Sequence, residues 1–398
     1  MDTESSLSDE SYFGQEGHEN SIEDLDASKE AIEAVENCLS EQLKKLANFD
    51  GDEEEPAFEY PNPSSWNNVE LSETLGLVPT TNDYEIDYVK ISYVNANTRK
   101  KYSRILLILD KIHMLLTDKE SVTLRELYYQ LVGQDGGRIT QIYEAVGAIS
   151  IILGLPRGRL QIFATSKGLV AGNLKFTNSE EVQVDCSLSA QGETIPNNVD
   201  AMLNIITEAT MVIVVEKDAI FQKLLEEEFL KHLPFRAILI TGKGYPDLNT
   251  RKLLRKLAFE IVPQATFVCL VDGNPYGMEI MSVYKFGSLS MVWCGEPLAV
   301  PKLEWIGVLP SEFVNIDNAR LQDFSEADAN KAQSLMERTY LSLDMQNELA
   351  FMTNCGKKAE IEDVASPSAY LMSKLFQPFD VWKLKRKTMK IKLCSLCR

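Results

Sequence analysis

The residues best suited to chemistry lie in the stretch TLRELYYQLV, which spans residues 123–132. If this stretch is a helix, one buried stripe at helical spacing is formed by Leu124, Leu127, Tyr128 and Leu131. Arg125 and Tyr129 lie four residues apart on another face, close enough to touch. We therefore expect Tyr128 to pack and Tyr129 to face solvent beside a permanent positive charge. That arrangement suits a nucleophile that attacks a phosphate, although adjacent tyrosines also occur in purely structural helices.

A second candidate site consists of oxygen-bearing side chains at the ends of two expected strands. Glu216 ends the run MVIVVE, Asp272 ends TFVCLVD, and Asn274 stands two residues further on. In a doubly wound sheet, ligands collect at the carboxyl ends of the strands. Two carboxylates and an amide oxygen would suit magnesium, which binds a few protein oxygens and substrate phosphate. Either acidic residue alone could instead cap the helix after its strand, but their joint placement with DGNPYG favours a metal.

Several other classes of active site are disfavoured. The three histidines are His18, in an acidic segment, His113, on an expected helix, and His232, at an expected helix end. A Ser-His-Asp triad, a Cys-His pair or a histidine zinc site is therefore not expected.

The segment TGKGYPDLNTR, residues 241–251, lacks the GxxxxGK[ST] spacing of a P-loop. ATP hydrolysis is therefore not expected. Lys243 and Arg251 within it could neutralise a phosphate, while an ordinary strand-to-helix turn would equally explain its glycines.

Composition indicates two or three domains with hydrophobic cores, because the chain has 398 residues of which 44% are hydrophobic. No apolar run is long enough to span a membrane, and the acidic first residues do not resemble a secretory signal. Seven cysteines without a framework pattern indicate free thiols in a reducing compartment. The pair Cys394 and Cys397 lacks partners for a zinc site.

The net charge of −19 is unevenly distributed. Residues 1–65 contain 19 Asp and Glu and 3 Lys, whereas residues 99–167 contain 11 Lys and Arg against 6 Asp and Glu. The acidic charge therefore belongs to an N-terminal region, and the surroundings of Tyr129 are basic, as nucleic-acid binding requires. The last 16 residues contain seven Lys and Arg and no acid.

We expect residues 1–65 to be largely disordered apart from one amphipathic helix at residues 28–46. Its narrow apolar seam consists of Ile32, Val35, Leu39, Leu43 and Leu46. This helix either packs on its own domain or docks a partner, and the sequence does not decide between them.

A basic amphipathic helix is expected at residues 98–116, followed by the Tyr129 helix and a third helix at residues 139–153. The glycine-containing stretch at residues 157–176 could then form a β-wing, which would complete a winged-helix arrangement. The local excess of positive charge favours phosphate contact by a set of four residues over ordinary surface charge. These DNA-facing candidates are Arg138, Arg157, Arg159 and Lys167.

From Met211 onward, apolar runs alternate with helical patterns, which predicts a mostly parallel sheet with right-handed crossovers. Strands are expected at MVIVVE, RAILIT and TFVCLVD, and later at SMVWC and EWIGVLP. After Pro310 the chain is expected to be mixed and largely helical.

Six stretches, in this order, resemble one known family. They are LRELYYQL, TSKGLVAGNL, IVVEKDAIFQKLL, ITGKGYPDLNTRKLL, LVDGNPYGMEIMSVYKFGSLSM and WIGVLPS. Over about residues 56–377 they resemble the catalytic chain of topoisomerase VI (its A-type component) and the eukaryotic relatives that make meiotic double-strand breaks. The resemblance implies an α/β chain in which a winged-helix domain of the catabolite-activator type precedes a Toprim domain with a Rossmann-like parallel sheet. The expected divisions are residues 1–65, 66–175, 200–376 and a basic tail at 377–398.

The family's motifs assign roles by position. The nucleophilic tyrosine falls on Tyr129 with Arg125 four residues before it, and the Toprim acidic residues fall on Glu216 and Asp272. The family's second aspartate is replaced here by Asn274, which removes one negative charge and puts the number and affinity of bound metals in doubt.

The resemblance further implies a magnesium-assisted transesterification on double-stranded DNA that leaves a 5′-phosphotyrosyl link. It also implies a homodimer with composite sites, a topoisomerase VI B-like partner, further meiotic break factors and a nuclear location. A topoisomerase component that reseals its breaks and a catalytically impaired DNA-binding scaffold remain as alternatives.

Overall fold

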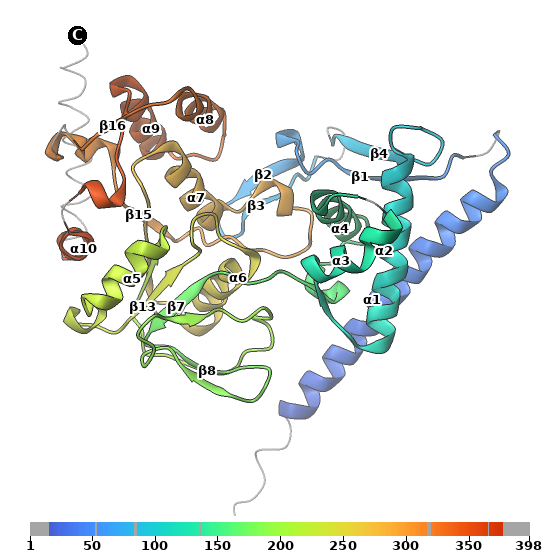
Figure 1. Cartoon of the computed structure of the whole chain (residues 1–398), viewed down its shortest axis with the longest axis horizontal. Coiled ribbons are helices and arrows are strands. Elements are labelled where there is room, and N and C mark those ends of the chain that lie inside the picture. Colours follow the sequence, from blue (N-terminus) through green and yellow to red (C-terminus); the bar gives the residue numbers. More distant parts are fainter. Residues whose placement is uncertain are drawn as a thin grey trace, which may run out of the picture. The chain divides into compact units, whose positions relative to one another are not determined.

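The structure is a computed structural model that describes residues 16–51, 54–82, 86–135, 137–316, 320–364 and 366–376 (Figure 1). The chain forms two compact units. Of the described residues, unit 1 contains those within 16–70, 79–165 and 289–296, and unit 2 contains those within 71–78, 166–288 and 297–376. Within the described residues, no helix has the length and apolar character needed to cross a membrane.

Unit 1 is built mainly from helices. They are α1 (Glu16–Asn48), α2 (Arg99–Asp118), α3 (Leu124–Asp135) and α4 (Ile139–Leu153). Strand β1 (Ala57–Pro61) pairs antiparallel with β4 (Tyr88–Ser92), and the two-residue strand β5 (Val122–Thr123) pairs parallel with β6 (Ile162–Phe163). The three helices expected between residues 98 and 153 are confirmed, with shifts of at most three residues at their ends.

The core of unit 1 forms around one stripe of α2. Ile105, Ile108 and Ile112 recur at three- and four-residue steps, and each is fully buried. Helix α4 contributes its own apolar face to the same core, which includes Val146 and Ile149. The same core includes Leu124, Leu127 and Leu131, so the buried stripe of α3 is anchored in it.

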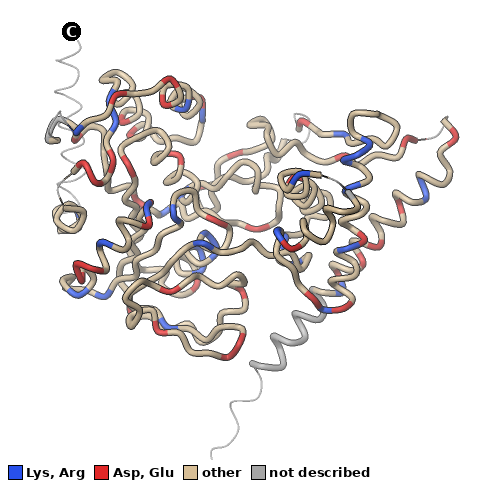
Figure 2. Tube along the Cα trace, in the orientation of Figure 1, with Lys and Arg blue, Asp and Glu red and all other residues tan. Residues whose placement is uncertain are grey.

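Helix α1 packs on its own unit. It begins at Glu16, whereas the sequence pattern predicted a start near residue 28. Val35 is fully buried in the unit 1 core, and only Leu43 of the predicted seam is well exposed, at 56%. Tyr102 Oη on α2 donates a hydrogen bond to Gln42 Oε1 on α1 at 3.0 Å. Acidic residues recur along α1 between its lysines (Figure 2), so α1 exposes a charged face while its apolar face is covered within unit 1.

Unit 2 contains a six-stranded sheet in the order β10-β7-β13-β12-β14-β15. Its strands are β7 (Leu169–Gly172), β10 (Glu193–Thr194), β12 (Met211–Val215), β13 (Ala237–Thr241), β14 (Thr266–Leu270) and β15 (Glu304–Gly307). The pairs β12–β13, β12–β14 and β14–β15 are parallel, whereas β7 and β10 are added antiparallel. The predicted mostly parallel sheet is confirmed. The inner strand β12 is apolar throughout, as expected of a strand that is buried on both faces of a sheet.

Helices and a smaller sheet complete unit 2. The helices are α5 (Asp218–Glu226), α6 (Leu248–Lys256), α7 (Pro275–Phe286), α8 (Glu326–Met336), α9 (Leu343–Cys355) and α10 (Pro367–Leu375). A three-stranded sheet has the order β11-β8-β9 and comprises β8 (Lys175–Thr177), β9 (Gln183–Asp185) and β11 (Leu203–Ile206). The mixed, largely helical character expected after Pro310 is confirmed for the described residues.

Two expectations about strands are wrong. The stretch at residues 157–176 was expected to form a β-wing, but its strand β7 pairs with β13 in the large sheet of unit 2, and only its two-residue strand β6 pairs within unit 1. Gly172 permits this pairing: it has φ +99°, and a Cβ there would lie 2.4 Å from the carbonyl oxygen of Ala237. The run SMVWC, expected as a strand, lies in the short 3-10 helix η6 (Leu289–Met291) and the turn after it, and belongs to unit 1.

Candidate active site

Helix α3 presents Tyr129 and buries its neighbours. A reciprocal cap fixes its start: Thr123 N donates to Glu126 Oε2 at 2.6 Å, and Glu126 N donates to Thr123 Oγ1 at 3.2 Å. Leu127 is fully buried and Tyr128 is half-buried, whereas Tyr129 is 65% exposed. The prediction that helical spacing separates the two tyrosines is therefore confirmed.

Arg125 supplies a positive charge on the same helix. It is exposed one turn before Tyr129, and residues four apart on a helix are neighbours. The rings of Tyr128 and Tyr129 lie 5.4 Å apart between centroids, with an angle of 55° between their planes. The packed ring of Tyr128 therefore lies next to the exposed ring of Tyr129.

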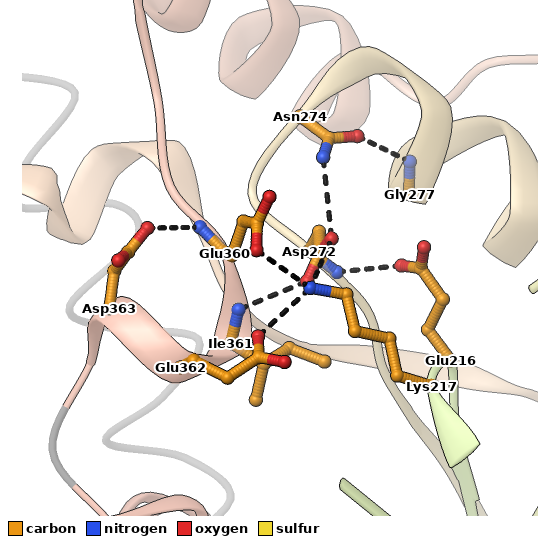
Figure 3. Close-up of polar contacts among 9 residues, drawn as sticks. All are labelled: Glu216, Lys217, Asp272, Asn274, Gly277, Glu360, Ile361, Glu362 and Asp363. Carbon is orange, nitrogen blue, oxygen red and sulfur yellow. Dashed lines mark hydrogen bonds and ion pairs between the residues drawn. The ribbon is translucent and has the colours of Figure 1, made fainter. Parts of the chain in front are cut away.

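Glu216 and Asp272 meet at the carboxyl ends of two adjacent parallel strands (Figure 3). Glu216 directly follows β12 and Asp272 stands two residues after β14. Asp272 N donates a hydrogen bond to Glu216 Oε2 at 2.9 Å. Both residues are buried, at 8% and 4% exposure, so the predicted meeting of these two carboxylates at one edge of the sheet is confirmed.

Asn274 is the N-cap of α7. Its Oδ1 accepts a hydrogen bond from Gly277 N at 2.8 Å, and its Nδ2 lies 3.5 Å from Asp272 Oδ2. The amide oxygen therefore satisfies the start of a helix, and the amide nitrogen faces the neighbouring carboxylate (Figure 3). In this arrangement Asn274 contacts Asp272 and caps α7, and its expected role as a magnesium ligand stays a prediction.

Lys217 lies in the acidic site and was not singled out from the sequence. Its Nζ lies 3.2 Å from Asp272 Oδ2, 3.0 Å from Glu360 Oε2 and 2.9 Å from Glu362 Oε2. The two glutamates flank Ile361 in the segment of the short helix η8 (Ile361–Asp363), and Ile361 N donates to Asp272 Oδ1 at 3.0 Å. The only sequence signal was adjacency to Glu216, because the glutamates stand more than 140 residues later.

Burial disfavours the ionised form of both carboxylates in this site. Burial, and then repulsion from Asp272, raises the pKa of Glu216 to about 7. Burial also raises the pKa of Asp272 to about 6, although Lys217 opposes that shift. For Lys217, burial opposes the charged form, but its bond to Glu362 and the charge of Asp272 raise its pKa overall. An additional cation would therefore be stabilised here.

The donor chemistry suits a divalent cation. Glu216 and Asp272 supply hard carboxylate oxygens, and because burial raises both pKa values, a bound cation would favour their ionised forms. Among the described residues, however, no three His, Cys, Asp or Glu side chains converge in a ready metal cluster. Glu216 and Asp272 fit a metal chemically, while Lys217 already contacts one oxygen of Asp272.

The DNA-facing candidates of unit 1 differ in their surroundings. Arg138 is exposed at the N-cap of α4. Arg157 is half-buried with its Nη2 3.9 Å from Met291 Sδ, and burial lowers its pKa. Arg159 forms an ion pair with Glu30 of α1 at 2.8 Å. Of these three arginines, Arg138 is the one whose side chain is mostly exposed.

The candidates of unit 2 form one pair and one separate residue. Lys167 is exposed, and its Nζ donates to the carbonyl oxygen of Lys243 at 3.3 Å. Lys243 itself pairs with Asp218 at 3.1 Å. Arg251 is 5% exposed and bonds Ser288 Oγ at 3.3 Å. The structure thus brings two of the lysines together and places Arg251 inside unit 2, where its burial disfavours direct phosphate contact.

Two family models match the chain. Residues 100–162 match the model of type IIB DNA topoisomerases, and residues 211–378 match the model of the Toprim domain shared by Spo11 and the A-type component of topoisomerase 6. The first match contains Tyr129 and Arg125, and the second contains Glu216 and Asp272. These matches confirm the predicted fold class, in which a winged-helix region precedes a Toprim domain.

Individual relatives are similar over most of their length. The mouse meiotic recombination protein SPO11 is 36% identical over 363 residues, which cover 88% of this chain and 87% of that protein. Its human counterpart is 35% identical over 89% of this chain and 88% of its own length. The rice meiotic recombination protein SPO11-2 is 35% identical over 70% of this chain and 72% of its own length. The chain therefore belongs to the family of Spo11 and the A-type component of topoisomerase VI.

Proposed function

We propose that this chain makes meiotic DNA double-strand breaks by transesterification, with Tyr129 as the nucleophile. Family membership assigns a type IIB topoisomerase-like, DNA-cleaving enzyme of meiotic recombination. The observation that carries the residue assignment is the 65% exposure of Tyr129 on a capped helix, beside the exposed Arg125. Tyr128 is the alternative nucleophile, but its packing in unit 1 counts against it.

The proposed reaction exchanges one phosphodiester for another. Tyr129 Oη attacks a backbone phosphorus and forms a bond to it, the phosphorus–3′-oxygen bond breaks, and the 3′-oxygen takes up a proton. The phenol loses its proton, and because an ordinary phenol has a pKa of about 10, the neighbouring guanidinium of Arg125 would favour the developing negative charge. The phosphotyrosyl ester conserves the bond energy, so cleavage requires no ATP.

Glu216 and Asp272 are the residues that would hold magnesium. A bound magnesium ion would supply positive charge to the phosphate and to the leaving oxygen. The contribution of this chain is to keep both carboxylates buried, adjacent and oriented by the hydrogen bonds from Asp272 N and Ile361 N. Asn274 keeps Asp272 in place from the start of α7.

Several further parts of the proposal concern partners and location. The substrate is double-stranded DNA, with phosphate contacts from the exposed Arg138 and from the Lys167–Lys243 pair. Two copies would be needed to cut both strands, with the tyrosine of one protomer acting with the acidic site of the other. A topoisomerase VI B-like partner, other meiotic break factors and a nuclear location complete the proposal.

The decisive experiment compares two single-atom changes in the same helix. Full-length protein with Tyr129→Phe should form no covalent DNA complex and make no meiotic breaks, because the attacking oxygen is absent. Tyr128→Phe removes the hydroxyl of the packed neighbour and should retain both activities to within a few-fold. Recovery of covalent protein–DNA complexes from meiotic cells, with mapping of the linked residue, measures the outcome. Adducts that persist in Tyr129→Phe would disprove the assignment.

A resealing topoisomerase component is the second candidate, because residues 100–162 match the type IIB topoisomerase model. Both candidates share the cleavage chemistry and differ in whether the broken ends are rejoined. Relaxation of supercoiled plasmid by the chain reconstituted with a B-type partner would favour the topoisomerase. Accumulation of linear DNA with protein on both 5′ ends would favour the break-making enzyme.

A further inference from the structure

Lys217 is held by three carboxylates from distant parts of unit 2 (Figure 3). Among the described residues, it is the cation that lies within ion-pair distance of Asp272. The Asp272 side chain is 5% exposed, whereas Glu360 and Glu362 are 43% and 45% exposed. Removal of Lys217 would therefore leave Asp272 buried without a counter-charge, whereas water could solvate both glutamates.

The ammonium of Lys217 also has ion-pair partners other than Asp272. Lys217 Nζ already contacts Glu360 and Glu362 at 3.0 and 2.9 Å, both shorter than its 3.2 Å distance to Asp272. Lysine carries its charge on a flexible four-carbon stem with three donors. A small shift of the ammonium away from Asp272 would therefore keep two of its three ion pairs.

We propose that Lys217 is the resident cation of the acidic site, that a divalent metal ion displaces its ammonium from Asp272, and that Glu360 and Glu362 retain it. The inference rests on the proposed metal role of Glu216 and Asp272. Metal binding is then an exchange of cations on a buried carboxylate, and Lys217 sets the metal concentration at which that exchange occurs.

This exchange explains two geometric features of the site together. The described residues form no ready cluster of three acidic ligands, and one oxygen of the buried Asp272 is already contacted by Lys217 Nζ at 3.2 Å. A site closed by its own lysine would show both features, because the ammonium blocks that oxygen. The ion pairs with the more exposed Glu360 and Glu362 give the ammonium partners that remain when it leaves Asp272.

The first test measures metal binding without DNA. Mn²⁺ and Mg²⁺ are titrated calorimetrically into the full-length protein at pH 8, where proton competition for the carboxylates is low. Lys217→Met keeps the apolar stem and removes the competing charge, so it should bind Mn²⁺ about tenfold more tightly than the wild type. Lys217→Arg keeps the charge and should stay within about threefold of the wild type.

Lys331 offers a matched control. It is 26% exposed and pairs with the buried Glu279 at 2.8 Å, much as Lys217 is 25% exposed and pairs with Asp272. Lys331→Met should leave the affinity for Mn²⁺ unchanged. Thermal melting in EDTA reports whether each variant is folded. A Lys217→Met protein that melts like Lys331→Met but binds Mn²⁺ no more tightly than the wild type would overturn the proposal.

A double-mutant cycle tests the role of the glutamates. The double substitution Glu360→Gln and Glu362→Gln should weaken Mn²⁺ binding several-fold in the wild-type background. The ammonium of Lys217 would then have no carboxylate partner when it leaves Asp272. In the Lys217→Met background the same pair should have an effect of less than about twofold. An equal loss in both backgrounds would mean that the glutamates bind the metal themselves, and would overturn their assigned role.

The outcomes are separate from those of the cleavage test. Mn²⁺ titration involves neither Tyr129 nor DNA, so failure of the Tyr129 assignment leaves it intact. Absence of Mn²⁺ binding in both the wild type and Lys217→Met would refute the cation exchange, while covalent adducts mapped to Tyr129 would still support the proposed cleavage.

Discussion

Tyr129 is 65% exposed on a helix of unit 1, whereas Asp272 is 4% exposed at the end of a strand in unit 2. Around Tyr129 the structure provides one exposed arginine on the same helix. Around Asp272 it provides the ammonium of Lys217, the backbone N–H of Ile361 and the side-chain amide of Asn274. Three further carboxylates lie nearby, those of Glu216, Glu360 and Glu362. A neutral phenol can be exposed at little energetic expense, while a buried carboxylate must be held by many partners.

The two residues differ in how many structural elements fix their positions. The position of Tyr129 follows from one helix, its cap and the packing of Leu127. The position of Asp272 requires β12, β14, α7 and the η8 segment together. We therefore expect the exposed Tyr129 side chain to contribute little to the free energy of unfolding, and the buried acidic site to lower it. Four substitutions test this comparison through the free energy of unfolding, ordered from the largest expected effect to the smallest.

Leu127→Ala should have the largest effect, because it removes a fully buried side chain from the inner face of α3. We expect a loss of about 2–5 kcal/mol, measured by chemical denaturation followed by circular dichroism. Val132 on the same helix is 40% exposed, and Val132→Ala should lose less than about 1 kcal/mol. Equal losses would show that α3 is not anchored by its buried stripe.

Glu216→Gln should raise the free energy of unfolding of the metal-free protein, whereas Leu127→Ala should lower it. The glutamine can still accept the bond from Asp272 N, and the repulsion between buried charges disappears. The folded pKa of about 7 lies above the ordinary value of 4.5, so the ionised group lowers stability above pH 7, and this effect fades as the pH falls toward 4.5. We expect a gain of about 1–3 kcal/mol in EDTA at pH 8 and none at pH 4.5.

Glu226 provides the control for that experiment, since it is exposed at the end of the helix that follows Glu216. Glu226→Gln should change the free energy of unfolding by less than about 0.5 kcal/mol at both pH values. A loss of stability in Glu216→Gln at pH 8 would show that the carboxylate is fully compensated in the folded protein. The prediction that the ionised Glu216 lowers the stability of the metal-free protein would then be wrong.

Thr123→Ala should have a smaller effect, because it removes one half of the cap that begins α3. We expect a loss of about 1 kcal/mol and faster hydrogen exchange in the first turn of the helix. Glu126→Gln keeps an acceptor for Thr123 N and should cost less than half as much. If Thr123→Ala leaves exchange in the first turn unchanged, packing alone determines where the helix begins.

Tyr129→Phe should change stability least, by less than about 0.5 kcal/mol, although it is expected to abolish the covalent DNA adduct. The hydroxyl lies on an exposed side chain, so its removal leaves no buried group unpaired. Denaturation of Tyr129→Phe and Tyr128→Phe under the same conditions gives the comparison. A large loss in Tyr129→Phe would mean that the residue is structural, and would make a missing adduct uninformative.

Local patterns in the sequence predicted the parts of the structure that depend on one element. Helical spacing predicted α2, α3 and α4 and which tyrosine is exposed. The apolar run before Glu216 predicted a buried strand, and the alternation of strands and helices predicted that Glu216 and Asp272 meet. Each of these follows from the periodicity of a helix or the topology of a parallel sheet.

Long-range pairing escaped the same reasoning. Strand β7 was expected in a wing because nothing within residues 157–176 indicates a partner as distant as β13. The contact of Lys217 with Glu360 and Glu362 depends on how the chain returns after α9, and a lysine after a strand carries no signal of its own. The apolar run SMVWC satisfies the pattern of a strand, but it packs against the core of unit 1 instead.

The assignment of residues 289–296 to unit 1 has a consequence for how the protein is made. Cys294 is 3% exposed in the core of unit 1, and Trp293 packs against that core. The ribosome releases this segment about 130 residues after α4, so unit 1 cannot complete its core until most of the unit 2 sheet has been synthesised. A fragment that ends at residue 165 would leave that apolar surface uncovered, and we expect such a fragment to aggregate unless residues 289–296 are supplied.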